Sequence, residues 1–211
     1  MASILQTVQR PGRVAGKVAL ITGGTGGIGM AIAMRLGQEG ARLVLTDINP
    51  EHGLASVQML AASGIEAIFL QHDVRDESSW KQVVEQACAR FGCLHVLVNN
   101  AGIALPPPES LELTSFDDWR RIMSVNLDGV FLGCREGVRA MKEGGGSIIN
   151  IGSVAAYVGT PGGSAMRPTS GTRSPSRTPS RASRRSSSRR RGWAFRGKKV
   201  PGSTTASAGG W

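Results

Sequence analysis

Short apolar runs rich in β-branched residues recur along the first 165 residues and predict β-strands. They lie at 17–22, 42–47, 66–71, 94–99 and 147–152. Between them, apolar residues spaced three or four positions apart predict helices at 28–40, 51–63, 76–91 and 115–142, the last divided into two helices. Alternating strands and helices are typical of a parallel sheet that is covered by helices on both faces.

The composition changes abruptly after residue 165. Residues 1–165 hold all 15 acids and 13 of the 25 Lys and Arg residues, whereas residues 166–211 hold the other 12 cations and no acid. The second segment has no Leu or Ile and a single Val, so it has little apolar surface with which to offset the entropy of folding. We therefore expect one folded domain at 1–165 and a disordered, low-complexity Arg/Ser/Pro/Gly tail at 166–211.

The bulk composition indicates a soluble protein of the cytoplasm. We identify no signal peptide and no apolar run long enough to span a membrane. The three cysteines, Cys88, Cys93 and Cys134, show neither a disulfide framework nor a metal-ligand spacing. We expect them to be idle thiols in a reducing compartment, and we expect no metal site.

The first predicted strand ends in a glycine-rich turn, TGGTGGIG at 22–29, that opens directly into a helix. Gly24, Gly26 and Gly29 have the spacing GxGxxG. Glycines at this spacing allow a tight turn and let backbone amides approach a pyrophosphate at the helix N-terminus. The position between strand and helix makes the motif more specific than a glycine-rich turn alone, and it predicts a dinucleotide site.

Asp47 ends the second predicted strand, 18 residues after Gly29. A carboxylate at this position can accept hydrogen bonds from both hydroxyls of the adenosine ribose, and its charge repels a 2′-phosphate. No Arg or Lys occurs at 22–29 or 46–50 to bind such a phosphate. The sequence therefore favours NAD over NADP, although Asp47 could also simply end a strand.

Three further motifs complete a family pattern: HDV at 72–74, NNAG at 99–102 and the serine of INIGSVAA. With the glycine turn, they make residues 17–165 resemble the short-chain dehydrogenase/reductase family. The resemblance implies a Rossmann-like, doubly wound parallel sheet in three α/β/α layers, which here is truncated after the fifth strand. It also implies reversible hydride transfer between a nicotinamide and a secondary alcohol or ketone.

The resemblance assigns the cofactor contacts to motif positions. The turn residues hold the phosphates, Asp47 binds the adenosine ribose, Asp73 and Val74 contact the adenine, and the NNAG segment lies beside the ribose. Ile48 is also assigned to the cofactor site. The implied turn residues are Gly23, Thr25, Gly27, Ile28 and Gly29, and those of the NNAG segment are Asn100, Ala101 and Gly102. His72 has no acid partner evident in the sequence, so we interpret it as a strand-end residue rather than a catalyst.

Two residues match catalytic positions of the family. Asn126, in SVNLDG, matches the asparagine at a helix kink where a water is held for proton relay, and Ser153 matches the serine that bonds the substrate oxygen. The alternatives are that Asn126 only packs in a helix and that Ser153 is only a turn residue.

The family's TyrxxxLys motif is missing from its expected place. There, a Tyr phenol with an ordinary pKa of about 10 is made more acidic by a Lys four residues later. The two slots hold Met166 and Ser170 in this chain, and Tyr157 is too close to Ser153 to replace the missing tyrosine. We therefore expect the chain as written to be catalytically inactive.

A reading-frame shift explains this departure. Loss of one T from GCT TAT GCG would turn Ala-Tyr-Ala into Ala165, Met166 and the start of an Arg codon. Restoring the base allows a Lys codon four positions after the Tyr, and it turns TCN serine codons into apolar ones. The affected serines have the spacing of a buried helix: Ser176, Ser180, Ser183 and Ser187. Our hypothesis is that residues 166–211 are out-of-frame translation, although they could be a genuine segment.

The preferred function is an NAD-dependent oxidoreductase acting on a small alcohol or ketone. Two alternatives remain: a nucleotide-binding sensor or partner subunit, and an inactive NAD-binding protein whose basic tail binds RNA or another anionic partner. Nucleic-acid binding is disfavoured because few aromatic residues accompany the arginines of the tail. The family habit of forming dimers or tetramers is doubtful for a truncated chain.

Overall fold

The computed structural model describes residues 12–104 and 111–153. All of them belong to the first of two compact units, Met1–Arg173. The sequence predictions about Tyr157, Met166, Ser170 and the basic tail lie outside the described residues.

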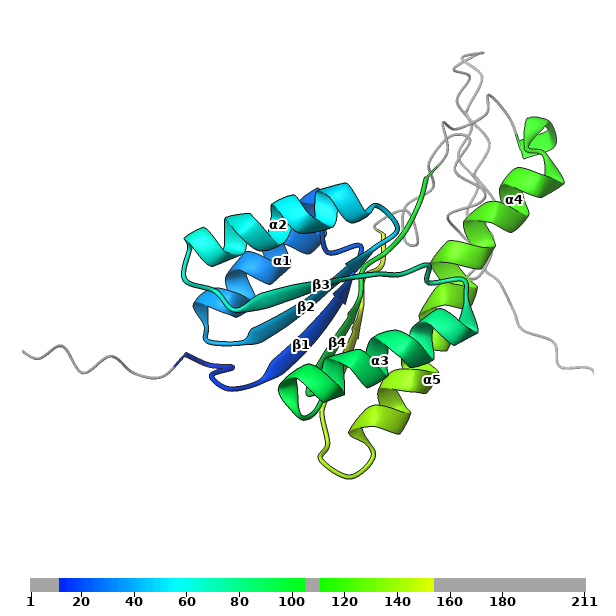
Figure 1. Cartoon of the computed structure of the whole chain (residues 1–211). Helices are drawn as coiled ribbons and strands as arrows, with labels where there is room; N and C mark the ends of the chain where they lie inside the picture. The colour runs from blue at the N-terminus through cyan, green and yellow to red at the C-terminus, as the bar shows by residue number, and fades with distance from the viewer. Residues whose placement is uncertain (1–11, 105–110, 154–211) are drawn as a thin grey trace, which may run out of the picture. The chain divides into compact units, whose positions relative to one another are not determined.

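The domain is built on one sheet of five parallel strands in the order β3-β2-β1-β4-β5 (Figure 1). The strands are β1 (Val18–Thr22), β2 (Arg42–Asp47), β3 (Ala67–Gln71), β4 (Val96–Asn99) and β5 (Ser147–Asn150). Each lies inside a run predicted from the sequence. The alternation of strands and helices and the Rossmann-like α/β fold are therefore confirmed.

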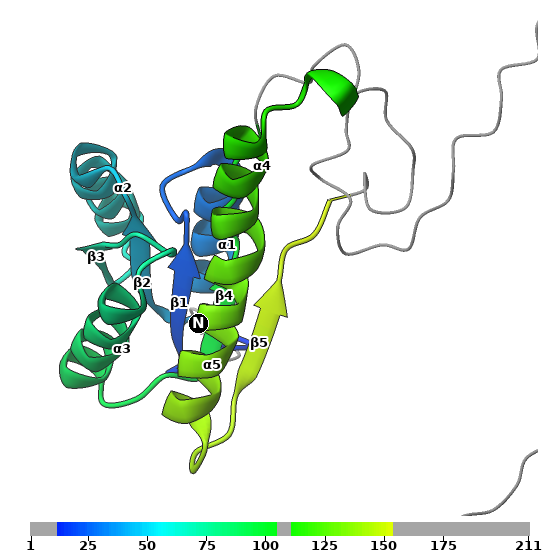
Figure 2. The same ribbon diagram turned by 90° about the vertical axis from the view of Figure 1, so that its right-hand side faces the viewer.

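Helices lie on both faces of the sheet. In Figure 1, α1 (Gly27–Gln38) and α2 (Pro50–Ala62) lie above it, and α3 (Glu77–Phe91) and α5 (Gly129–Met141) lie below it. The side view in Figure 2 shows the long helical element formed by α4 (Phe116–Met123) and α5 in front of the strands. Within the described residues, none of the helices is both long and apolar enough to cross a lipid bilayer.

The predicted helical region 115–142 contains two helices, α4 and α5, as expected, but no loop separates them. A π-helical segment, η2 (Ser124–Asp128), joins α4 directly to α5, and a short 3-10 turn, η1 (Leu111–Leu113), precedes them. The α-helical hydrogen-bond pattern changes at η2, so the chain passes from α4 to α5 without a loop. Single-turn π segments of this kind frequently mark functional sites.

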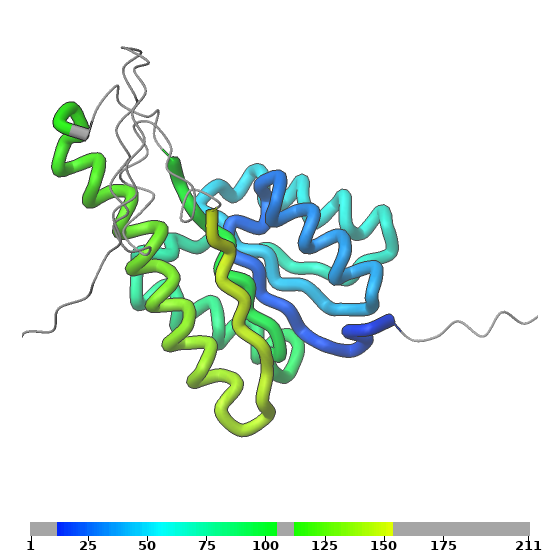
Figure 3. The backbone as a smooth tube through the Cα atoms, turned by 180° about the vertical axis from the view of Figure 1, so that it is seen from behind, coloured from blue at the N-terminus to red at the C-terminus, as the bar shows by residue number. Residues whose placement is uncertain are grey.

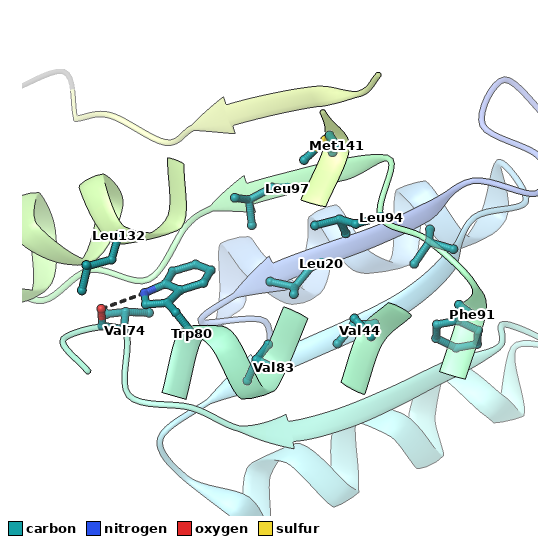
Figure 4. Packing of buried hydrophobic residues seen from close by; sticks show 12 residues of the cluster. Leu20, Val44, Val74, Trp80, Val83, Phe91, Leu94, Leu97, Leu132 and Met141 are labelled. Carbon is teal, nitrogen blue, oxygen red and sulfur yellow. Dashed lines mark hydrogen bonds between the residues drawn. The ribbon is translucent and has the colours of Figure 1, made fainter. Parts of the chain in front are cut away.

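The side chains of β1 alternate between two hydrophobic clusters, one on each face of the sheet. Val18 and Leu20 pack with α3 and α5, whereas Ala19 and Ile21 pack with α1 and α2. Trp80 is fully buried in the first cluster, and Figure 4 shows its indole nitrogen bonded to the Val74 carbonyl oxygen. Because β1 is buried on both faces, the loops that follow the central strands are attached to a rigid support.

Strand β5 forms one edge of the sheet among the described residues, and Figure 3 shows it running beside β4. Ile148 packs against the cluster shared by α3 and α5. Ile149 and Ile151 are 44% and 40% exposed.

Candidate functional site

A pocket of about 290 Å³ opens at the carboxyl ends of the strands. Residues that follow β1, β2, β3 and β4 all contribute to its walls, together with residues of α4 and η2. The lining residues are Gly23, Asp47, Ile48, His72, Asp73, Val74, Arg75, Ala101, Gly102, Ile103, Arg121 and Val125. Strand order reverses between β1 and β4, and doubly wound sheets bind ligands outside the strand ends at such a point.

The glycine turn between β1 and α1 requires glycine for local reasons. Gly23 has φ +59°, and a Cβ there would lie 3.0 Å from the Ala101 Cα. A Cβ on Gly29 would collide with the carbonyl oxygen of Gly23. Close packing of the turn against the helix therefore excludes side chains at both positions, as the sequence motif indicated.

The N-terminus of α1 has the properties of an anion site. Its N-cap is Gly26, no side chain caps the helix, and the first turn contains no acidic residue. The first amides of a helix have no acceptor within the helix, and the helix dipole adds a partial positive charge there. The exposed side chain of Ile28 stands in this turn. These features fit the diphosphate of a dinucleotide cofactor.

The Asp47 carboxylate is held at the rim of the pocket by three donors. Its Oδ2 accepts a hydrogen bond of 2.6 Å from the Thr25 hydroxyl. Its Oδ1 accepts from the Ile48 amide at 2.8 Å and from the Asn49 amide at 3.4 Å. The carboxylate oxygens have further lone pairs, so they can also accept hydrogen bonds from a sugar diol.

Asp73 and Val74 form the wall of the pocket beyond β3. Arg75 binds Asp73 with an ion pair of 2.6 Å, and this side-chain hydrogen bond lowers the pKa of the Asp73 carboxyl. The Val74 carbonyl oxygen accepts a 2.9 Å hydrogen bond from the Trp80 indole. The wall is therefore anchored to the hydrophobic core through Trp80.

His72 is buried behind this wall with only 2% of its surface exposed. Its Nδ1 lies 3.1 Å from the Thr46 hydroxyl, and its ring meets the edge of Trp80 with centroids 4.5 Å apart. Burial lowers its pKa to about 4, against the opposing charges of Asp73 and Asp76. The imidazole is therefore neutral at pH 7, in agreement with its interpretation as a strand-end residue.

The NNAG segment ties the ends of β1 and β4 together. The Asn100 side chain donates to the carbonyl oxygens of Thr22 and Gly23 at 2.9 and 3.0 Å. The Thr22 hydroxyl in turn accepts from the amides of Asn100 and Ala101, both at 3.0 Å. Ala101 and Gly102 are thereby placed in the pocket wall.

Asn126 lies in η2, and its side chain makes two hydrogen bonds to the backbone of Ile103. Its Oδ1 accepts from the Ile103 amide at 2.8 Å, and its Nδ2 donates to the Ile103 carbonyl oxygen at 2.9 Å. The helix irregularity predicted at this residue is present as the π segment. Its predicted role in proton relay stays a prediction, as does the catalytic role of Ser153.

Ser153 is half-buried and lies three residues beyond β5, on the carboxyl side of the sheet. Among the other predicted site residues, Gly23, Asp47, Ile48, Asp73, Val74, Ala101 and Gly102 line the pocket. Thr25 and Asn100 support it through hydrogen bonds. Gly27 and Ile28 line a shallow hollow on the outer side of α1.

Sequence reasoning missed Arg75, Ile103, Arg121 and Val125 as pocket residues. Neither cation lies in 22–29 or 46–50, because Arg75 comes from the β3 end and Arg121 from α4. Arg75 directly follows the HDV motif, so its place in sequence was a usable signal. Two cations therefore line the pocket together with Asp47 and Asp73.

Within residues 12–104 and 111–153, no three His, Cys, Asp or Glu side chains cluster so that they could hold a metal ion. The three cysteines carry no disulfide.

Comparison with known proteins identifies the family to which the site residues point. A family profile described as short chain dehydrogenase matches residues 17–166. A 3-beta-hydroxysteroid dehydrogenase of Comamonas testosteroni is 43% identical over 146 residues, covering 69% of this chain and 56% of the relative. An NADP-dependent (R)-specific alcohol dehydrogenase of Lentilactobacillus kefiri is 42% identical over 151 residues, covering 71% and 59%.

A third relative is the 3-alpha-(or 20-beta)-hydroxysteroid dehydrogenase of Mycobacterium tuberculosis. It is 46% identical over 151 residues, covering 71% of this chain and 56% of the relative. The chain thus spans less than two thirds of the length of each of these three proteins.

Proposed function

The chain belongs to the short chain dehydrogenase family, and from this premise we propose that it is an oxidoreductase domain that binds NAD. The family uses nicotinamide cofactors, and one relative is NADP-dependent by name. Membership of the family therefore does not decide between the two cofactors, and the preference for NAD is part of our proposal. We also propose that the domain ends near residue 165 and that residues 166–211 are not part of it.

The observation that carries the proposal is the position of the Asp47 carboxylate. It lies in the wall of the pocket, beside the glycine turn that leads into α1. A diphosphate at the α1 N-terminus and an adenosine ribose at Asp47 are the two parts of one dinucleotide. A carboxylate accepts hydrogen bonds from ribose hydroxyls but repels a 2′-phosphate, which supports NAD.

The chain's own residues would bind and orient this cofactor. The amides at the start of α1 would hold the phosphates, and Asp47 would accept from the ribose hydroxyls. The exposed apolar side chain of Ile48 and the Asp73–Val74 wall would flank the adenine. When bound, NAD supplies a nicotinamide ring that accepts or donates a hydride.

We propose a secondary alcohol or its ketone as the substrate class. Two relatives are hydroxysteroid dehydrogenases and one is an alcohol dehydrogenase by name. In this assignment the Ser153 hydroxyl hydrogen-bonds the substrate oxygen, and Asn126 holds the Ile103 segment beside the pocket. The proton donor of the family is missing from its sequence slot, where Met166 stands. We therefore propose that the 211-residue chain binds NAD but turns over little substrate.

A binding experiment tests the cofactor site without requiring turnover. The full chain is titrated with NADH while the fluorescence of the nicotinamide is followed. Gly23→Ala forces a Cβ to within 3.0 Å of Ala101 in the pocket wall and strains a φ of +59°. We expect this variant to lose at least about tenfold in affinity, because it combines strain with displacement of the turn.

Gly64→Ala is the matched control. Gly64 has φ +72° with nothing within 4 Å of an added Cβ, and it follows α2 outside the pocket lining. It therefore shares the backbone strain of Gly23→Ala but leaves the pocket intact, and NADH affinity should stay at the wild-type value. A wild-type chain that folds but binds neither NADH nor NADPH rules out the proposal.

A further inference from the structure

We propose that Thr25 is a positioning residue that gives the site its preference for NAD over NADP by holding the Asp47 carboxylate in place. The inference rests on the proposed function, because it assumes that the pocket binds a nicotinamide dinucleotide. It concerns a side chain that acts on the cofactor through Asp47. The family resemblance placed Thr25 only among the residues that cradle the phosphates.

The Thr25 hydroxyl joins the glycine turn to the pocket residue Asp47. It donates to Asp47 Oδ2 at 2.6 Å, although the two residues are 22 positions apart in the chain. A bond this short, from a hydroxyl to a charged oxygen, is among the stronger hydrogen bonds in proteins. The Gly24 amide makes a second link, to the Thr46 carbonyl oxygen at 3.0 Å. The glycine turn and the end of β2 are therefore joined as one unit.

The three donors together fix the rotation of the carboxylate. The Ile48 and Asn49 amides bind only Oδ1, at 2.8 and 3.4 Å, so they leave the carboxylate plane poorly defined. The bond from Thr25 to the other oxygen defines it. A carboxylate that is oriented before the ligand arrives loses less conformational freedom on binding. Thr25 therefore increases the affinity for a ligand whose ribose hydroxyls bind Asp47.

The same bond opposes a ligand with a 2′-phosphate. The phosphate is an anion and an acceptor, so it gains nothing from Asp47 and is repelled by it. A carboxylate released from Thr25 could rotate away from the phosphate, whereas a held one cannot. Arg75 is a poor compensating partner, because it is already bound to Asp73 at 2.6 Å. Arg121 is the other cation in the pocket lining.

The test compares NADH and NADPH dissociation constants, measured by fluorescence titration of the full chain. Thr25→Val removes the hydroxyl and keeps the shape, and Thr25→Ser keeps the hydroxyl and removes the methyl group. We expect Thr25→Val to reduce the ratio of the NADPH to the NADH dissociation constant by about five- to tenfold, the worth of one such hydrogen bond. We expect Thr25→Ser to retain the wild-type ratio within about twofold.

A double-mutant cycle with Asp47→Asn separates the positioning role from a general effect on folding. If Thr25 acts through the carboxylate, Thr25→Val should change the ratio much less in the Asp47→Asn background. Thermal unfolding of each variant checks that it folds. If Thr25→Val is not folded, Thr25→Ala is measured in its place with the same expectation.

The outcomes are distinguishable. A wild-type chain that binds neither dinucleotide overturns both the proposed function and this inference. A wild-type preference for NADH that survives in Thr25→Val overturns only the role of Thr25. The same conclusion follows if Thr25→Ser shifts the ratio as far as Thr25→Val does, or if Thr25→Val has its full effect without the Asp47 carboxylate.

Discussion

Burial of the His72 imidazole makes the stability of the domain depend on pH. Its pKa is about 4 in the folded protein against an ordinary 6.5, mainly because burial penalises the charged form. The neutral ring thus contributes stability above pH 6.5, and this contribution is lost as the pH falls toward 4. The loss should reach about 3 kcal/mol, since each pKa unit corresponds to about 1.4 kcal/mol. Urea unfolding at a series of pH values measures it.

His72→Gln is the comparison for this experiment because glutamine does not titrate. The variant should lose much less stability than the wild type as the pH falls from 6.5 to 4. Burial also lowers the pKa of His95, with help from Lys17 and Arg42, and Arg75 lowers that of Asp73. Both groups remain in the variant, so the difference between the two curves isolates His72. Parallel curves would contradict this assignment.

The Asn126 side chain should stabilise the domain through its two bonds to Ile103, at 2.8 and 2.9 Å. We expect Asn126→Ala to reduce the free energy of unfolding by about 2 kcal/mol, since each bond contributes about 1 kcal/mol. Ser124→Ala is the control in the same π segment. Its hydroxyl only donates to the Arg121 carbonyl oxygen of the preceding helical turn. Equal losses for both variants in urea unfolding would contradict the role of Asn126.

At the scale of the elements, the hydrophobic pattern predicted the five strands and the principal helices of the described residues, because each strand contains a short apolar run and the helices repeat apolar residues every three or four positions. The π segment η2 was predicted only as a kink through the family resemblance. The spacing of apolar residues in 115–142 does not reveal where the backbone hydrogen bonds change from the α-helical to the π-helical pattern. The contact that accompanies the segment, from Asn126 to Ile103, joins parts of the chain 23 residues apart.

The alternation of side chains along β5 gives a test of this edge strand. Ile148 packs on the hydrophobic cluster beneath the sheet, whereas Ile149 is 44% exposed. We expect Ile148→Lys to destabilise the domain by about 2 kcal/mol, because it places a charge against that cluster. Ile149→Lys should change stability by less than about 0.5 kcal/mol and should reduce aggregation, because lysine discourages edge-to-edge pairing.

Urea unfolding and light scattering measure the two effects on β5 separately. If Ile149→Lys destabilises the domain as much as Ile148→Lys does, the assignment of the two faces is wrong. If light scattering of Ile149→Lys equals that of the wild type, the exposed edge is not the aggregating surface.

At the scale of the whole molecule, the sequence predicted those pocket residues that belong to short motifs with unusual composition. Glycines in a turn, an acid at a strand end and the NNAG segment are visible as local exceptions. Arg121, Ile103 and Val125 enter the pocket only because helices and loops converge there. Such residues look ordinary in their own segments, so only the folded arrangement identifies them.

We predict that this chain has little or no catalytic activity. The purified 211-residue protein should bind NADH but should not oxidise it measurably when a secondary ketone is added, as followed by absorbance of the reduced nicotinamide. The physical reason is the absence of a Tyr and a Lys from the slots at Met166 and Ser170. Turnover at an ordinary enzymatic rate would contradict this prediction.

The coding DNA provides the matched comparison. Its sequence around the Ala165 codon shows directly whether one restored base yields Tyr and Lys codons. A protein expressed from such a restored frame should gain ketone reduction with NADH. If the codons are incompatible with Tyr and Lys, residues 166–211 are not the product of a shifted frame.

Thr22 ends β1 and is only 1% exposed. Its hydroxyl oxygen accepts hydrogen bonds from the amides of Asn100 and Ala101, at 3.0 Å each. While the ends of β1 and β4 stay together, the buried Thr22 hydroxyl shields these two amide protons from solvent deuterium. They should therefore exchange as slowly as protons deep in β1, although they belong to a loop. The part of the pocket wall that Ala101 forms would then be as long-lived as the centre of the sheet.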